Sequence, residues 1–142
     1  MAPPISKENA RKTVTGSDPA AGAEFSETIP AGKIWNLIAI AVAFVADATV
    51  ASRTPEIIID DGTNEILRLT DRTVITASQT RTLQANRFGV LPADTATVHY
   101  FILPLGFELP AGYRVRSVTT NLQAGDNYGA PKLIVDEYVI VP

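Results

Sequence analysis

The sequence contains no cysteine, and its 142 residues include a single histidine, His99. The absence of cysteine excludes disulfide frameworks, thiolate metal sites and cysteine nucleophiles. A Ser-His-Asp triad would have to use His99, which lies in the β-rich run TVHYFIL, and no G-x-S-x-G nucleophile motif accompanies it. We therefore expect a structural role for this histidine and predict that the chain is not an enzyme and holds no cofactor or metal.

The excess of acidic over basic residues is also small. The 12 basic and 15 acidic residues leave a net charge of −3, which is too small to attract nucleic acid or an anionic membrane over a distance. The longest apolar run, residues 34–46, is interrupted by Asn36 and is shorter than the roughly 20 residues that a membrane helix needs. We expect neither nucleic acid nor a membrane as a partner.

Short β-rich runs separated by turn residues fill the rest of the chain, a pattern typical of an all-β sandwich or barrel. The run EIIIDDGTNEILRL predicts a hairpin that turns at Asp61-Gly62. The start, residues 1–22, is rich in proline, serine and basic residues and indicates an extended N-terminal arm. We predict a jelly-roll-like two-sheet β-sandwich of about eight strands over residues 23–142. The expected strands cover residues 23–29, 33–47, 56–60, 65–70, 74–83, 97–103, 113–121 and 133–141.

One turn phrase occurs twice, as IPAGKIWNL at residues 29–37 and as LPAGYRVRS at residues 109–117. Proline fixes its own φ near −65°, and glycine readily takes a positive φ, so each phrase predicts a tight turn that leads into a strand. In a jelly roll, two corresponding strands would begin at similar corners of the two interlocked Greek keys.

The strand expected after the first phrase is apolar on both faces. A sheet that faces water should be polar on one side, so either a bulge or an intramolecular cover buries the second face, or another subunit does. The side chains expected to be most buried lie at the centres of the strongest strand runs: Ile38, Ile40, Val42, Val98, Tyr100, Ile102, Val115 and Val135.

Arginine supplies eight of the 12 basic residues, and arginine is enriched at protein interfaces, where lysine is depleted. The candidate contacts with further subunits or with another protein are Ile5, Lys7, Arg11, Lys12, Arg53, Arg114 and Arg116. The Gly/Asn/Asp-rich segment QAGDNYGAP at residues 123–131 is either a long strand connection or a ligand loop. The alternative ligand site there consists of Asp126, Asn127 and Tyr128.

Several segments together resemble a group of small virion proteins of tailed bacteriophages. They are IPAGKIWNLIAIAVAF, the hairpin DDGTNEILRL, the late segment LPAGYRVRSVTTNLQAGDNYGAP and the closing VDEYVIV. The resemblance implies a capsid decoration or cement protein with a β-sandwich fold on the outer capsid surface. Its expected partners are the major capsid protein and further copies of itself in a homotrimer. The alternative is a tail or head-fibre module that contacts a host glycan.

Overall fold

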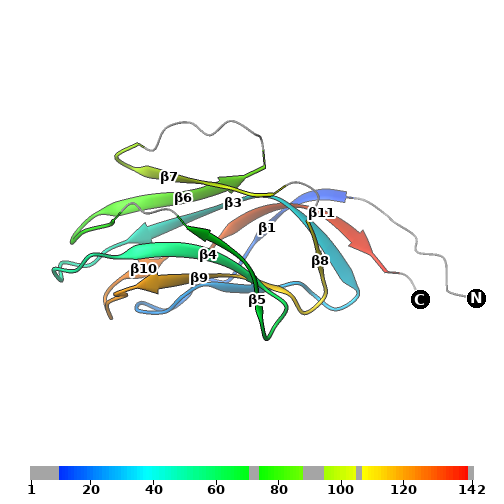
Figure 1. Cartoon of the computed structure of the whole chain (residues 1–142), viewed down its shortest axis with the longest axis horizontal. Coiled ribbons are helices and arrows are strands. Elements are labelled where there is room, and N and C mark those ends of the chain that lie inside the picture. Colours follow the sequence, from blue (N-terminus) through cyan, green and yellow to red (C-terminus); the bar gives the residue numbers. More distant parts are fainter. Residues whose placement is uncertain (1–9, 71–73, 88–94, 105–106, 141–142) are drawn as a thin grey trace, which may run out of the picture.

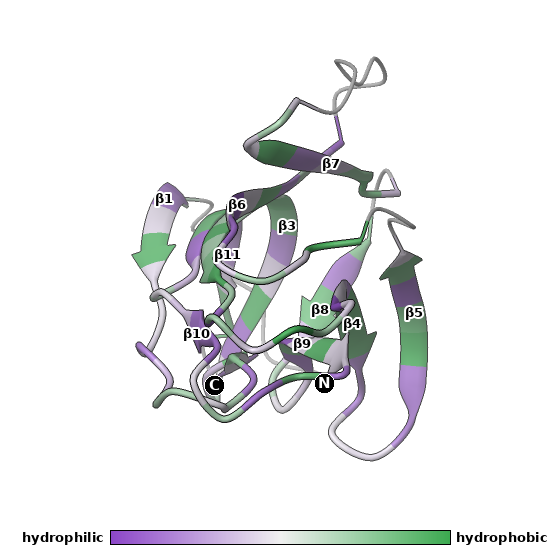
Figure 2. Ribbon diagram, turned by 90° about the vertical axis from the view of Figure 1, so that its left-hand side faces the viewer, coloured by the Kyte–Doolittle hydropathy of each residue, from purple (hydrophilic) through white to green (hydrophobic). Residues whose placement is uncertain are grey.

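The computed structural model describes residues 10–70, 74–87, 95–104 and 107–140 and shows two β-sheets packed face to face (Figure 1). Figure 2 shows β1, β11, β3 and β6 on one side of the sandwich and β4, β5 and β9 on the other. The described residues form no helix that could cross a membrane. The strands are β1 (Ala10–Thr15), β2 (Ser26–Thr28), β3 (Lys33–Val45), β4 (Thr54–Asp60), β5 (Glu65–Thr70), β6 (Thr80–Asn86), β7 (Val98–Ile102), β8 (Glu108–Pro110), β9 (Arg114–Thr120), β10 (Asn127–Tyr128) and β11 (Lys132–Val139).

The strand order identifies the fold. The first sheet, sheet A, has the order β1-β11-β3-β6-β7, and the second, sheet B, has the order β2-β9-β4-β5. When β7 and the short strands β8 and β10 are set aside, successive strands alternate between the sheets, except for the hairpin β4-β5 within sheet B. This is the arrangement of two interlocked Greek keys. The jelly-roll sandwich predicted from the sequence is confirmed.

Three strands extend this framework on the side of sheet A. β7 pairs in parallel with β6 and lengthens the sheet by one strand. β8 pairs with the start of β3 and β10 with its end. β3 is therefore the central strand of sheet A, with neighbours along both of its edges.

A bulge at Ile38 explains why β3 is apolar on both faces. The ladder with β11 pairs Leu37 with Val135 and Ala39 with Ile134, so Ile38 is the additional residue. The bulge shifts the alternation by one position, and large side chains before and after it all face the core. These core residues are Trp35, Leu37, Ile40, Val42 and Phe44. Of the alternatives left open by the sequence, the bulge accounts for the pattern within one chain.

The predicted core is correct outside β7 and wrong within it. Ile38, Ile40, Val42, Val115 and Val135 are buried as expected. On β7 the inward side chains are His99 and Phe101, whereas Val98 and Tyr100 are only half-buried and Ile102 is 62% exposed. Both faces of this strand carry large apolar residues, so its composition does not determine which face turns inward.

The two copies of the turn phrase lie side by side. In each, the carbonyl of the proline accepts a hydrogen bond from the residue three positions later, at 3.2 Å from Lys33 and 3.2 Å from Tyr113. The glycines Gly32 and Gly112 have φ values of 74° and 87° at the third turn position. Ile29 donates to the Tyr113 carbonyl at 2.8 Å and accepts from Gly112 at 3.0 Å. The repeated phrase therefore builds two adjacent corners, from which β3 and β9 start.

The expected boundary between an arm and a sandwich at residue 22 needs correction. Residues 10–15 form β1, which pairs with β11 along its full length. After β1, Gly16 donates to the Pro131 carbonyl and Gly22 to the Asp126 carbonyl, both at 2.7 Å. A backbone ladder can hold a polar segment that has no apolar core of its own, so residues 10–22 belong to the sandwich. Residues 1–9 lie outside the described residues.

Candidate interaction surfaces

The side chain of Arg53 is fully buried at one end of the sandwich. Its Nε donates to both carboxylate oxygens of Asp126, at 3.1 and 2.9 Å, and its Nη2 donates to Oδ1 of Asp47 at 2.6 Å. Its Nη1 donates to the carbonyl oxygens of Thr49 and Ala51, each at 3.0 Å. One guanidinium group thus joins the loop between β3 and β4 to the loop between β9 and β10.

Asp126 connects the same two loops from the opposite side. It is fully buried and accepts hydrogen bonds from the backbone N–H groups of Asp47 at 2.9 Å and Gln123 at 2.7 Å. Burial opposes its ionisation, but the bonds from Arg53 and the two N–H groups hold the pKa of Asp126 below its ordinary value. The pair is an internal brace, which corrects the prediction of Arg53 at an interface and Asp126 in a ligand loop.

Tyr128 is also a core residue and not part of an exposed loop. It is fully buried, its hydroxyl lies 2.6 Å from Oγ1 of Thr119, and its ring lies 5.4 Å from that of Phe25 and 4.7 Å from that of Phe44. Burial raises the pKa of its phenol. Of the three residues in the alternative ligand site, only Asn127 is exposed.

The predicted contact residues Arg114 and Arg116 lie on the outer face of sheet B, where both bind Asp60. Nε and Nη2 of Arg114 donate to the two oxygens of Asp60 at 2.7 and 3.0 Å, and Nε of Arg116 donates at 2.5 Å. Asp60 is buried, which opposes its ionisation, yet the two arginines and the N–H of Gly62 lower its pKa to about 2. About a third of each arginine side chain remains exposed.

A second ion-pair group lies on the same face. Arg68 pairs with Glu56 on the neighbouring strand, and its Nη2 lies 2.6 Å from Oε2 of Glu65. The outer face of sheet B therefore carries closely spaced charges that are paired within the chain.

The predicted contacts Arg11 and Lys12 lie on β1 and pair with consecutive acidic residues of β11. Nε of Arg11 lies 2.8 Å from Oδ1 of Asp136, and Nζ of Lys12 lies 2.8 Å from Oε2 of Glu137. The two basic side chains are still 61% and 44% exposed. They hold an edge strand in place and also present positive charge to the surroundings.

Glu137 is the more buried of these two acids and binds the single tryptophan. Its Oε2 accepts from Nε1 of Trp35 at 2.8 Å, and its Oε1 accepts from Nζ of Lys33 at 3.1 Å. Burial opposes ionisation, but the bonds from Lys12, Trp35 and Lys33 lower the pKa of Glu137 to about 2. Trp35 is therefore a core residue whose indole N–H is bonded within the chain.

The outer face of sheet A contrasts with that of sheet B. The registers place its outward residues in rows across the strands from β11 to β7. On β3, β6 and β7 every outward residue in these rows is uncharged. The first row is Ile134, Ala39, Asn86 and Ile102; the second is Lys132, Ala41, Gln84 and Tyr100; the third, on β3, β6 and β7, is Ala43, Thr82 and Val98.

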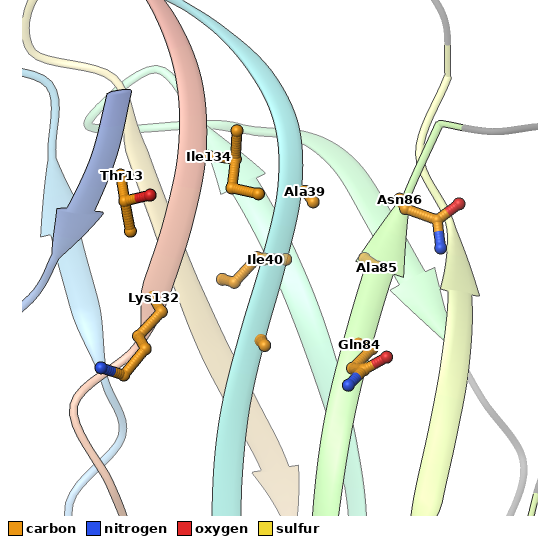
Figure 3. Close-up of a pocket in the computed structure, with 9 residues that line it drawn as sticks. Thr13, Ala39, Ile40, Gln84, Ala85, Asn86, Lys132 and Ile134 are labelled. Carbon is orange, nitrogen blue, oxygen red and sulfur yellow. The ribbon is translucent and has the colours of Figure 1, made fainter. Parts of the chain in front are cut away.

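A shallow trough of about 350 Å³ follows β3 across this face (Figure 3). Its floor includes Ala39 and Ala41, two of the small outward side chains of β3. Ile134 and Lys132 form one wall, and Gln84 and Asn86 on β6 form the other. A second depression of about 210 Å³ continues it past Ala43. The alternating alanines at 39, 41 and 43 were the sequence signal for this trough. Without knowledge of the bulge at Ile38, however, the alternation of β3 did not show that these alanines face outward.

Two predicted contact residues, Ile5 and Lys7, lie outside the described residues. Among the residues that the structure describes, no three metal-binding side chains gather into a possible ion site. His99 is buried in β7. The accessible features described above are thus the edge of β1, the charged face of sheet B and the uncharged face of sheet A.

No protein-family model matches the sequence, and no curated protein matches it. Several solved structures align over nearly the whole chain at low identity. The coat protein of Tobacco streak virus aligns over 99% of this chain and 93% of its own, with 9% identity and a TM-score of 0.37. A structure of infectious bursal disease virus, Gx strain, aligns over 96% of this chain and 38% of its own, with 13% identity and a TM-score of 0.42.

Dimeric latent PorU from Porphyromonas gingivalis also aligns, over 95% of this chain and 12% of its own, with 11% identity and a TM-score of 0.41. The similar structures thus include both a virus coat protein and a bacterial protein that is much longer than this chain. The jelly-roll assignment therefore rests on the strand order observed here.

Proposed function

We propose that this chain is a structural protein of a bacteriophage particle, which decorates the outer surface of the capsid and stabilises it by bridging capsid subunits. The observation that carries the proposal is the location of the charged side chains, several of which are buried and paired within the fold. Arg53, Asp126, Asp60 and Glu137 are buried braces of the fold. Of the three accessible features, the edge strand β1 and the uncharged face of sheet A suit contacts with other proteins.

The contact with the major capsid protein is assigned to β1 and the segment before it. Within the described residues β1 pairs with β11 alone, so its other edge is available. Arg11 and Lys12 are about half exposed there. Exposed positive charges favour an acidic surface on the capsid, and such contacts weaken as salt is added. The resemblance of the sequence to small tailed-phage virion proteins supports the same partner.

The test is co-sedimentation of the purified protein with capsids that were assembled without it, over a series of salt concentrations. We expect binding at low salt that decreases with ionic strength, and capsids that withstand higher temperatures once decorated. Arg11→Gln should reduce retention, because it removes a largely exposed charge whose ion pair contributes little to stability. The matched control is Arg68→Gln, another exposed and paired arginine, on sheet B. Absence of binding at every salt concentration would refute the proposal.

A further inference from the structure

We propose that the uncharged face of sheet A binds the same face of a second copy of this chain, through a two-fold axis that runs parallel to the strands above β6. This inference deepens the proposed function, because two copies joined in this way carry two capsid contacts. It differs from the homotrimer expected from the sequence. The argument rests on the heights and charges of the outward residues.

The face has a ridge along β7 and a trough along β3, and the two lie at equal distances on either side of β6. β7 carries Val98, Tyr100 and the largely exposed Ile102, and β3 carries the small side chains that form the trough floor. β6 lies between them, so ridge and trough are two strand spacings apart, roughly 9.6 Å. A large residue on β7 shares a row with an alanine on β3 in all three rows, as Ile102 does with Ala39.

A two-fold rotation about an axis above β6 and parallel to it exchanges these features. It places β7 of each copy over β3 of the other, so that each ridge enters the other copy's trough, and this is the reciprocal contact of an isologous interface. In the same operation Ile102 meets Ala39 of the second copy, and Val98 meets Ala43. A two-fold axis perpendicular to the strands would instead place ridge on ridge.

The side chains beneath the axis suit contact with themselves. Thr82 and Gln84 on β6 each offer both a donor and an acceptor, so each can bond to its own counterpart. A charged residue at this position would face its own like charge, which is unfavourable. The outer face of sheet B, with Arg114, Arg116 and Arg68, would create such repulsion.

The size of the face sets the strength of the dimer. The three strands that overlap between the copies, β3, β6 and β7, at about 4.8 Å spacing and over residues 39–45 of β3, span roughly 14 Å by 20 Å, or about 300 Å² for each copy. The total of about 600 Å² is well below the 1,200–2,000 Å² of stable complexes, so the dimer should be weak and transient, with a dissociation constant in the micromolar range or above. On a capsid the local concentration of neighbouring copies would favour the joined state.

The test is sedimentation equilibrium of the complete protein from about 1 µM to about 1 mM. We expect the mass to rise from the 15.2 kDa of one chain toward twice that value. Ile102→Glu and Ala39→Lys should each raise the dissociation constant about tenfold or more. The matched control is Ile66→Glu, an exposed isoleucine on the edge strand of sheet B, which should leave the equilibrium unchanged.

A charge-swap variant tests the register itself. In the double variant Ile102→Glu with Ala39→Lys, the two new charges lie two strands apart within one chain but opposite each other between copies, so dimerisation should recover. A single-chain mass over the whole range would overturn the proposal, as would a three-chain mass or a double variant as weak as the single variants. Capsid binding by a protein that stays monomeric would refute this inference and leave the proposed function intact.

Discussion

Removing the carboxylate of Asp126 should be among the most damaging single changes in this protein. In the variant Asp126→Ala, the guanidinium of Arg53 stays buried and loses the two bonds from its Nε. The backbone N–H groups of Asp47 and Gln123 lose their acceptor as well. Breaking a buried ion pair by removing one partner costs about 3–5 kcal/mol. For a domain of this length, that corresponds to a fall in melting temperature of about 10–15 °C.

The assay is thermal and urea unfolding at pH 7, followed by circular dichroism. Glu108→Gln, at an exposed position on β8, is the matched control and should melt close to the wild type. The double variant Arg53→Met with Asp126→Leu should be less destabilised than the sum of its two single variants, because no unpaired charge remains inside. A melting temperature of Asp126→Ala within about 3 °C of the wild type would refute the claim that the Arg53–Asp126 pair stabilises the fold.

Three further predictions concern acid stability, core packing and a buried hydroxyl. Asp60 has a pKa of about 2 in the folded protein against an ordinary 3.8, so its contribution of about 2 kcal/mol is complete above pH 4 and is lost as the pH falls toward 2. Urea midpoints measured across this range should fall with pH, and Asp60→Asn should flatten that dependence; an unchanged slope would contradict the assignment. Ile40→Ala should cost about 2–5 kcal/mol in urea unfolding, whereas Ile134→Ala on the outer face should cost less than about 1 kcal/mol, and equal losses would count against the bulge. Tyr128→Phe removes the bond to Thr119 and should lower the stability measured by urea unfolding by about 1 kcal/mol, with an unaltered value arguing against that bond.

The fold was predictable because its signals are local. The Asp61-Gly62 turn, the two proline-glycine corners and the strand runs between them are each determined by a few neighbouring residues. The bulge at Ile38 depends instead on the pairing of β3 with β11, which lies about a hundred residues away in the chain. The sequence could therefore offer a bulge only as one of several explanations for a strand with two apolar faces.

The candidate contact residues were harder to place for a related reason. Arg53 and Asp126 are charged, and charged side chains are usually exposed unless they are paired. Their pairing joins two loops that are 73 residues apart, and no local pattern indicates it. Tyr128 lies in a glycine-rich stretch of loop composition, but the pairing of β10 with the end of β3 directs its side chain into the core. Arg11, predicted as a contact residue, lies on β1 with 61% of its side chain exposed, and its partner Asp136 became visible only with the register of β1 and β11.

The pairing of β1 with β11 also determines the order in which the protein can fold during synthesis. β1 leaves the ribosome before the other described strands, yet its ladder partner in the described part of the chain is complete only when residue 139 has been made. Until then the long apolar strand β3 lacks its β11 neighbour as well, so an unpaired strand edge is exposed in the nascent chain. Sheet A therefore closes after translation of this segment, and a product that ends before β11 would retain the aggregation-prone edge of β3 without the means to cover it.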